Sequence, residues 1–332
     1  MSDHLSFAPS TLVGDVVPSA EPLYTAEQTR ALDHLAIEAH GIPGIRLMDR
    51  AARAAFDVLL ECWPQPQTLQ VFCGTGNNGG DGFLIAALAH RRGIPVTIYQ
   101  LGDDAKIGGD AATARTQAVD EGIAITPYVE GMVLMPTGVI VDAMLGTGLG
   151  GAVREPYVAA IEAINDSGLP VLAVDIPSGL CSDTGRLLGC AVRADLTVTF
   201  IGMKCGLFTL DAADCTGAIH FSDLAVPLEV YDSVQARAGR LELESMLTLL
   251  PPRAANAHKG AFGRVLVVGG DLGMAGAAAM AAQAAARCGA GLVYAATRPE
   301  HVPALVARCP EVMAHGIDSG AGLEALLQQV DV

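Results

Sequence analysis

Short apolar runs alternate with amphipathic helical patterns along most of this chain. Strands that alternate with helices predict right-handed crossovers and a mostly parallel sheet. The pattern therefore predicts an α/β protein built as a Rossmann-like three-layer sandwich, with any ligand beyond the carboxyl ends of the strands. The predicted strands are residues 69–73, 96–101, 138–145, 171–176, 194–201 and 217–224, and helical patterns occupy residues 44–63, 109–122 and 156–168.

The first residues lack this pattern. Residues 1–22 have no basic start followed by an apolar core, so they do not form a signal peptide, and we expect a flexible tail. A helix is predicted to begin after Thr25, because Gln28 follows three residues later as in a capping box.

The alternation breaks near residues 234–260 and restarts with an apolar run at 264–270. We therefore predict a first domain at residues 23–235 and a second domain at residues 236–332. The second domain contains only two or three strands, which is little material for an independent core.

Composition excludes some classes of function. The chain has 20 Lys and Arg against 36 Asp and Glu, a net charge of −16, and no basic run, which argues against a nucleic-acid partner. Its most apolar helix, residues 274–286, is too short to span a membrane. The eight cysteines form no CxxC pair, so we expect reduced core cysteines and a cytoplasmic location.

One stretch, "VFCGTGNNGGDGF", places five glycines within nine residues between an apolar run and a helix that we expect to begin near Asp81. It satisfies the GxGxxG pattern of dinucleotide-binding loops, which is weak evidence alone. Gln100 stands where such a fold expects an acidic ribose ligand. Backbone N–H groups at a helix start bind anions, and asparagine amides add donors and acceptors. We expect this loop to approach a phosphate-bearing ligand closely.

Two more predicted strands end in polar loops. Asp142 precedes a second glycine-rich loop and either caps that turn or belongs to the site. Asp175 ends a fully apolar strand, so its carboxylate should be partly desolvated and suited to proton transfer, although it could also cap a turn. Lys204 could be an anion partner in the same crevice or a surface lysine.

Asn78, Asp142 and Ser178 offer oxygen ligands without imidazole or thiolate. Such a set does not suit zinc or copper. With one formal negative charge it suits a monovalent cation better than tightly held magnesium.

In combination, these motifs resemble the bifunctional NAD(P)H-hydrate repair enzymes. The resemblance implies an epimerase domain that interconverts (6R)- and (6S)-NADHX or NADPHX, followed by the N-terminal part of a ribokinase-like dehydratase domain that uses ADP or ATP. The matching stretches occur in order: "LYTAEQTRALD", "GIRLMDRA", "CGTGNNGGDGF", "VDAMLGTGLGG", "VLAVDIPSGLCSDTG", "ADLTVTFIGMKCGL" and "SDLAVP".

The resemblance also implies roles for single residues. Asp175 would be catalytic, and potassium would bind to Asn78, Asp142 and Ser178. The residues that would contact the hydrate are Asn77, Asn78, Gly79, Gly80, Asp81, Gly146, Thr147, Gly148, Leu149, Gly150, Gly151, Ala152 and Asp175 in the first domain, and Gly276 and Ala277 in the second.

The dehydratase resemblance departs from the family's pattern. The family's later glycine-rich loops, nucleotide site and catalytic aspartate segment do not occur before Val332. We therefore expect this chain, as given, not to dehydrate. The second domain should be poorly ordered or prone to aggregate unless it packs on the first.

Two other functions stay open. A Rossmann oxidoreductase would need an acidic ribose contact that the sequence does not supply. A non-catalytic nucleotide-binding or dimerisation module could dispense with the carboxylate and the cation ligands, so the presence of Asn78, Asp142, Asp175 and Ser178 favours the epimerase. The resemblance also allows a homodimer.

Overall fold

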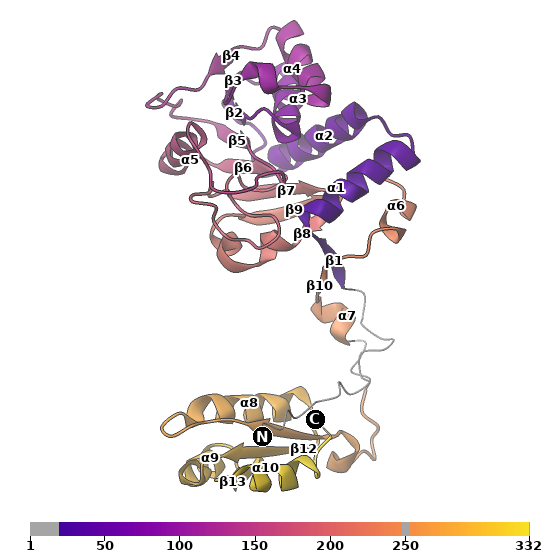
Figure 1. The fold of residues 1–332 in the computed structure, drawn as a ribbon, viewed down its shortest axis with the longest axis vertical. Coiled ribbons are helices and arrows are strands. Elements are labelled where there is room, and N and C mark those ends of the chain that lie inside the picture. The colour runs from indigo at the N-terminus through magenta and orange to yellow at the C-terminus, as the bar shows by residue number, and fades with distance from the viewer. Residues whose placement is uncertain (1–19, 248–251, 332) are drawn as a thin grey trace, which may run out of the picture. The chain divides into compact units, whose positions relative to one another are not determined.

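The computed structural model of the chain describes residues 20–247 and 252–331 (Figure 1). The chain divides into two compact units, Met1–Leu249 and Leu250–Val332, each with its own sheet. Most of the predicted tail, residues 1–19, lies outside the described residues.

The first unit contains a sheet of seven parallel strands. The strands are β2 (Leu69–Cys73), β3 (Val96–Gln100), β4 (Ile125–Pro127), β5 (Val139–Ala143), β6 (Val171–Val174), β7 (Leu196–Phe200) and β9 (Ala218–Ser222). Their order is β4-β3-β2-β5-β6-β7-β9. The chain moves outward from β2 to β4 and then crosses to β5 on the other side of β2, so the loops after β2 and β5 diverge and leave a crevice between them. All six predicted strands are confirmed, and β4 is an addition.

Helices cover both faces of this sheet (Figure 1). They are α1 (Ala26–His34), α2 (Gly44–Cys62), α3 (Asn77–Arg91), α4 (Gly109–Asp120) and α5 (Tyr157–Asp166), with the short α6 (Glu229–Asp232) and α7 (Leu243–Leu247) further along the chain. Because side chains alternate along a strand, Val71 belongs to the buried cluster that contains residues of α1 to α4, while its neighbour Phe72 belongs to the cluster that contains residues of α5. The predicted three-layer sandwich is therefore confirmed.

A small second sheet joins distant parts of the first unit. Its order is β10-β1-β8, formed by β10 (Ala238–Arg240), β1 (Glu21–Tyr24) and β8 (Met203–Lys204). The end of the predicted tail therefore lies in a strand, and the first compact unit continues past the predicted boundary at residue 235 because β10 pairs with β1. Immediately after β1, the predicted capping box is confirmed, because Thr25 and Gln28 each accept a hydrogen bond from the other's backbone N–H.

The glycine-rich stretch differs from the sequence prediction. Helix α3 begins at Asn77 and not near Asp81, with Gly76 as its N-cap. Both asparagines and the following Gly-Gly-Asp therefore belong to the first turns of a helix. The expected loop is reduced to the three residues after β2, residues 74–76.

Most glycines of this stretch are required by packing within the chain itself. A Cβ on Gly74 would lie 1.9 Å from the carbonyl oxygen of Met144, and one on Gly79 would lie 2.1 Å from the carbonyl oxygen of Gly74. Only Gly76 has no atom within 4 Å of the Cβ position. The close approach that we expected towards a ligand is thus mainly an approach of α3 to β2 and the loop after β5. The same holds for two more glycines: a Cβ on Gly80 would lie too close to Met48, and one on Gly82 would lie too close to Ala143.

The second unit has a sheet of three parallel strands in the order β11-β12-β13. Its elements are β11 (Arg264–Val268), α8 (Ala275–Cys288), β12 (Leu292–Thr297), α9 (Val302–Arg308), β13 (Met313–Gly316) and α10 (Gly320–Leu327). Its core is small and is built mainly from alanine, valine and leucine side chains of α8, β12 and α9.

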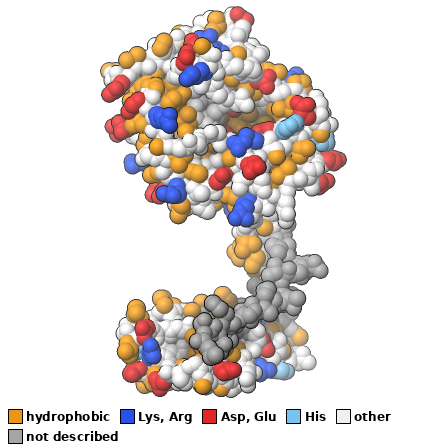
Figure 2. Space-filling model, viewed as in Figure 1, with side chains coloured by type: hydrophobic (Ala, Val, Ile, Leu, Met, Phe, Trp, Pro, Cys, Tyr) orange, Lys and Arg blue, Asp and Glu red, His pale blue; other side chains and the backbone are white. Residues whose placement is uncertain are grey.

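Three expectations from composition can be compared with the structure: the absence of a basic patch, the positions of the cysteines and the absence of a membrane-spanning helix. Figure 2 shows the Lys and Arg side chains of the visible face of the first unit scattered singly and not gathered in one patch. All eight cysteines are free, but Cys62 and Cys288 are exposed, contrary to the expectation of core positions. Within the described ranges, no helix is long and apolar enough to cross a membrane.

We predict that Gly74→Ala destabilises the first unit while Gly76→Ala does not. The added methyl group of Gly74→Ala meets the backbone of Met144, which costs about 1–3 kcal/mol as overpacking does elsewhere. Gly76→Ala meets no atom and should change the free energy of unfolding by less than about 1 kcal/mol, as expected for an N-cap glycine. Urea unfolding of both variants compares them, and equal losses would contradict the packing explanation.

Candidate functional site

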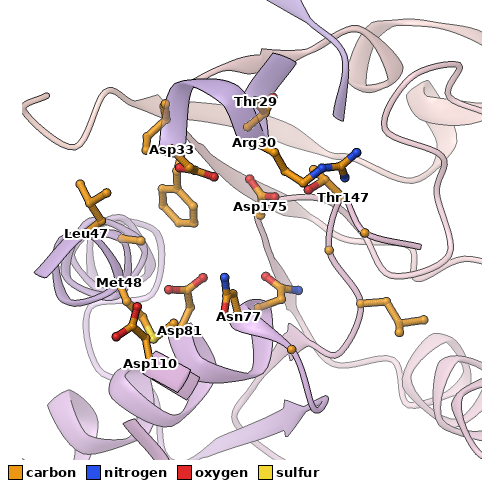
Figure 3. Close-up of a pocket in the computed structure, with 18 of the residues that line it drawn as sticks. Thr29, Arg30, Asp33, Leu47, Met48, Asn77, Asp81, Asp110, Thr147 and Asp175 are labelled. Carbon is orange, nitrogen blue, oxygen red and sulfur yellow. The ribbon is translucent and has the colours of Figure 1, made fainter. Parts of the chain in front are cut away.

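A cavity of about 540 Å³ lies beyond the carboxyl ends of β2, β5, β6 and β7. The loops after these strands form one side, and α1 and α2 form the other (Figure 3). It lies where the strand order reverses, which is where open parallel sheets bind ligands. Nine of the predicted substrate residues line it: Asn77, Asn78, Asp81, Gly146, Thr147, Gly148, Leu149, Gly150 and Asp175.

The remaining predicted contacts do not line this cavity. Gly79 and Gly80 are buried on the inner side of α3, where they pack against the chain. Gly151 and Ala152 are exposed beyond the end of the lining loop. Gly276 and Ala277 belong to the second unit; they are exposed in the first turn of α8, so they are not part of this site.

Asp175 occupies a strained turn at the end of β6. Its φ angle is 67°, which non-glycine residues rarely adopt, and the N–H of Ile176 donates to the carbonyl of Val174 across it, at 2.8 Å. Such a γ-turn around a residue with positive φ is rare and strained. It turns the Asp175 side chain out of the sheet and into the cavity (Figure 3).

Lys204 fixes one oxygen of this carboxylate. The Lys204 side chain is fully buried, and its Nζ donates to Asp175 Oδ1, to Thr199 Oγ1 at 2.8 Å and to the carbonyl of Phe200 at 3.0 Å. These three bonds use all three ammonium hydrogens. Asp175 Oδ2 lies on the other side, 3.9 Å from the position a Cβ would take on Gly146. Asp175 thus has one tethered oxygen and one oxygen towards the glycine-rich loop.

Of the three predicted cation ligands, Asn78 lines the cavity, whereas Asp142 and Ser178 do not line it and are hydrogen-bonded to each other. Asp142 and Ser178 are both fully buried; the Ser178 hydroxyl donates to Asp142 Oδ1 at 2.6 Å and its N–H donates to Oδ2 at 2.8 Å. Burial raises the pKa of Asp142 to about 6, although these hydrogen bonds act to lower it. Asn78 is buried too, and neither its amide oxygen nor its amide nitrogen has a partner among the described residues.

Three further carboxyl groups, those of Asp33, Asp81 and Asp110, line the cavity without a hydrogen bond to another described residue. Asp81 on α3 is buried, and Asp33 on α1 is half-buried. Burial raises the pKa of Asp81 well above its usual range, with smaller increases from Asp175 and Asp33. Burial also raises the pKa of Asp33 to about 6, while Lys204 acts to lower it and Asp175 to raise it. Burial therefore favours the protonated form of both Asp81 and Asp33.

The position expected for an acidic ribose ligand does not face the cavity. Gln100, at the end of β3, is buried, and its amide nitrogen donates to the carbonyls of Cys73 at 3.2 Å and Leu101 at 2.9 Å. Gln100 therefore supports the backbone at the ends of β2 and β3. This arrangement does not favour the Rossmann oxidoreductase.

Comparisons with known proteins identify the family of the chain. Residues 44–206 match the model of the YjeF-related protein N-terminus, and residues 265–332 match that of NAD(P)H-hydrate dehydratase. The chain is 46% identical over 310 residues to the bifunctional NAD(P)H-hydrate repair enzyme Nnr of Coxiella burnetii and 38% identical over 328 residues to that of Escherichia coli. The chain belongs to the NAD(P)H-hydrate repair enzyme family.

These matches cover 93% and 98% of this chain but only 63% and 62% of the two repair enzymes. The crystal structure of yeast ynu0, YNL200c, shares the fold, with a TM-score of 0.57 at 19% identity, and the match covers 67% of this chain and 96% of that one. The match of residues 265–332 agrees with the ribokinase-like fold expected for the second unit.

The sequence analysis did not identify several residues that line the cavity. Arg30, Asp33 and Ile37 line one face of α1 and its continuation, and Lys204 was left undecided between crevice and surface. The spacing of three and four residues between the α1 positions is a signal for a shared helix face. The burial of Lys204 has no comparable signal in the sequence.

We predict that Lys204→Met destabilises this repair-family protein by about 3–5 kcal/mol, because it leaves the Asp175 carboxylate without its buried partner. The double variant Lys204→Met/Asp175→Asn should recover part of the loss. Chemical unfolding of the single and double variants measures the coupling. The exposed Lys106→Met is the control, and a loss from Lys204→Met no larger than from Lys106→Met would refute the role of the pair.

We predict that Asp33→Asn becomes more stable relative to the native protein as pH rises. The folded pKa of about 6 lies above the ordinary 3.8, so the native protein loses stability as pH rises through this window, while asparagine does not titrate. The gain should reach on the order of 2–3 kcal/mol above the folded pKa. Urea unfolding across the window tests it. Glu27→Gln, exposed on the same helix, should give a flat difference, and a flat difference for Asp33→Asn would contradict its raised pKa.

Proposed function

We propose that the first unit is an NAD(P)H-hydrate epimerase that converts (6R)-NADHX or (6R)-NADPHX into the (6S) form. The observation that carries this proposal is the state of Asp175: one oxygen is held by the buried Lys204, and the other is directed to a cavity lined by the loops that the family resemblance assigns to substrate binding. This is the arrangement expected of an oriented acid–base group.

The cavity suits the substrate in size and polarity. Its volume of about 540 Å³ is within the range of small-molecule sites. The exposed Asn77 and the N-cap Gly76 stand at the start of α3, where free N–H groups favour phosphate or ribose oxygens. Asn77, Asp81 and the loop at residues 146–150 are proposed to hold the hydrate. Gly79, Gly80, Gly151 and Ala152 would then act through the backbone shape of these segments.

The proposed reaction breaks and re-forms the C6–O bond with proton transfers and needs no oxidant or reductant. The C6–O bond breaks as the hydroxyl takes a proton and leaves as water, and the lone pair of the ring nitrogen forms a planar iminium. Water then adds to either face of C6, the electron pair returns to nitrogen, and the surplus proton goes to a carboxylate. Asp175 Oδ2 is the group proposed to exchange these protons. Asp81, whose pKa burial raises well above its usual range, would donate a hydrogen bond to the substrate.

We propose that Asn78, Asp142 and Ser178 hold a potassium ion. The residues fit such an ion: the amide oxygen of Asn78 is buried without a partner, and among the described residues no lysine or arginine pairs with the buried Asp142. Oxygen donors with one negative charge suit a large monovalent cation, whereas the described residues contain no group of three or more His, Cys, Asp and Glu that could hold a metal. The ion would neutralise Asp142 and order the loop that follows it.

The second unit is proposed to belong to the nucleotide-dependent dehydratase part of the family's enzymes, with ADP or ATP as co-substrate and Gly276 and Ala277 near the hydrate. The match of residues 265–332 supports this assignment. The expectation that this chain, as given, does not dehydrate (6S)-NADPHX stays a prediction, and an assay with added ADP or ATP would check it.

We predict that the protein converts pure (6R)-NADPHX to the (6S) epimer faster than the spontaneous reaction, and faster in potassium than in sodium buffer. Proton NMR or chromatography of the two epimers measures the rate. Conversion without a potassium preference would remove the cation site and leave the epimerase. If neither buffer gives acceleration over the spontaneous rate, the protein is a non-catalytic ligand-binding module instead.

The variant Asp175→Asn separates catalysis from binding in the same assay. Its turnover should fall by about 100-fold or more, the usual contribution of an acid–base group, while NADPHX binding is retained. Asp57→Asn, an exposed change on α2, serves as the control. Unchanged turnover in Asp175→Asn would remove Asp175 from the mechanism.

A further inference from the structure

The cavity contains a carboxyl group from α1 that no predicted role accounts for. Asp33 is half-buried on the helical wall opposite the strand ends, and it has no hydrogen bond to another described residue. Figure 3 shows its side chain directed into the same part of the cavity as Asp175 and Asp81. A carboxyl group kept partly out of water without a protein partner costs free energy, and a hydrogen bond to a ligand in the cavity would offset this cost.

Lys204 cannot supply the proton that the proposed reaction needs. Its three hydrogens are bound to Asp175, Thr199 and the Phe200 carbonyl, and its side chain is fully buried behind them. The same bonds occupy Asp175 Oδ1, so only Oδ2 is directed towards the cavity. A second carboxyl group on the opposite wall would let one group protonate the leaving hydroxyl while Asp175 Oδ2 accepts the surplus proton.

Resting on the proposed epimerase function, we propose that Asp33 is a second catalytic acid–base residue: it protonates the hydroxyl that leaves C6, while the Asp175 carboxylate accepts the proton of the water that adds. The C6–O electron pair leaves with oxygen as water, and the nitrogen lone pair forms the iminium. When water attacks C6, the double-bond pair returns to nitrogen and one proton passes to Asp175 Oδ2. Water in the cavity returns this proton to Asp33 before the next turnover.

The electrostatics favour Asp33 over Asp81 for this role. Burial raises the pKa of Asp81 well above its usual range, which suits a hydrogen-bond donor. The pKa of Asp33, about 6, is closer to the working pH, where proton transfer in both directions is easiest. Two carboxyl groups in one site, one that donates a proton and one that accepts it, are a usual arrangement for acid–base catalysis. The other titratable and charged groups that line the cavity are Arg30 on α1, Asp81 on α3, Asp110 on α4, Asp175 after β6, Tyr157 on α5 and Lys204 on β8.

The test compares Asp33→Asn, Asp33→Ala and the control Glu27→Gln in the (6R)-NADPHX assay across pH. Asp33→Asn should lower kcat by about 100-fold with a small change in KM, as expected for loss of an acid–base group. The rate of the native enzyme should fall as pH rises and Asp33 loses its proton. The rate of Asp33→Asn should not show this fall. Asp33→Ala leaves room for a small acid, so added formate should restore part of its rate but not that of Asp175→Asn.

The outcomes separate this inference from the function on which it rests. If the native protein does not accelerate epimerisation, the proposed function fails. If the native protein is active and Asp33→Asn keeps its kcat and pH profile, only the role of Asp33 fails. A raised KM with unchanged kcat would make Asp33 a binding residue and overturn the proposal. Thermal unfolding of each variant confirms folding, and if Asp33→Asn does not fold, absence of formate rescue in Asp33→Ala decides against the proposal.

Discussion

An ammonium group that water cannot reach must find all its acceptors inside the protein, and Lys204 meets this constraint where three chain segments come together. Its acceptors come from the ends of β6 and β7. Its own strand, β8, pairs with β1, with Lys204 opposite Tyr24, and β1 leads directly into α1. The orientation of Asp175 and the placement of the helical wall that carries Asp33 both depend on this one buried charge.

The turns around this charge are strained in the same way. Asp175 and Ile201 are non-glycine residues with φ angles of 67° and 59°, and each is spanned by a hydrogen bond between the residues that flank it. The two turns end neighbouring strands, β6 and β7, and both residues line the cavity. Strain of this kind persists only where the surroundings fix the backbone, and it is concentrated at functional sites. The carboxylate held by Lys204 and the two strained turns therefore both indicate this end of the cavity as the place of the proposed reaction.

The sequence predicted the parts of this architecture that local patterns encode. Apolar runs located the six longer strands, and Asp175 stood out because it follows such a run directly. Long-range contacts were beyond these patterns: β8 has only two residues, and its pairing with β1 joins distant segments. The glycines were recognised as sites of close approach, but nothing local could reveal that Gly74 approaches Met144 and not a ligand. The flanking residues of Lys204 likewise gave no indication of its complete burial.

The pairing of β1 with β8 also bears on how small the functional domain can be. The family match spans residues 44–206, so it begins after α1 and ends just beyond Lys204. A fragment cut at those limits would keep most of the large sheet and the start of α3. It would lose the helical wall with Asp33, the strand that pairs with β8, and the edge strand β9. The recognisable domain is therefore shorter than the physical one, and the missing segments are those that close the cavity around the buried lysine.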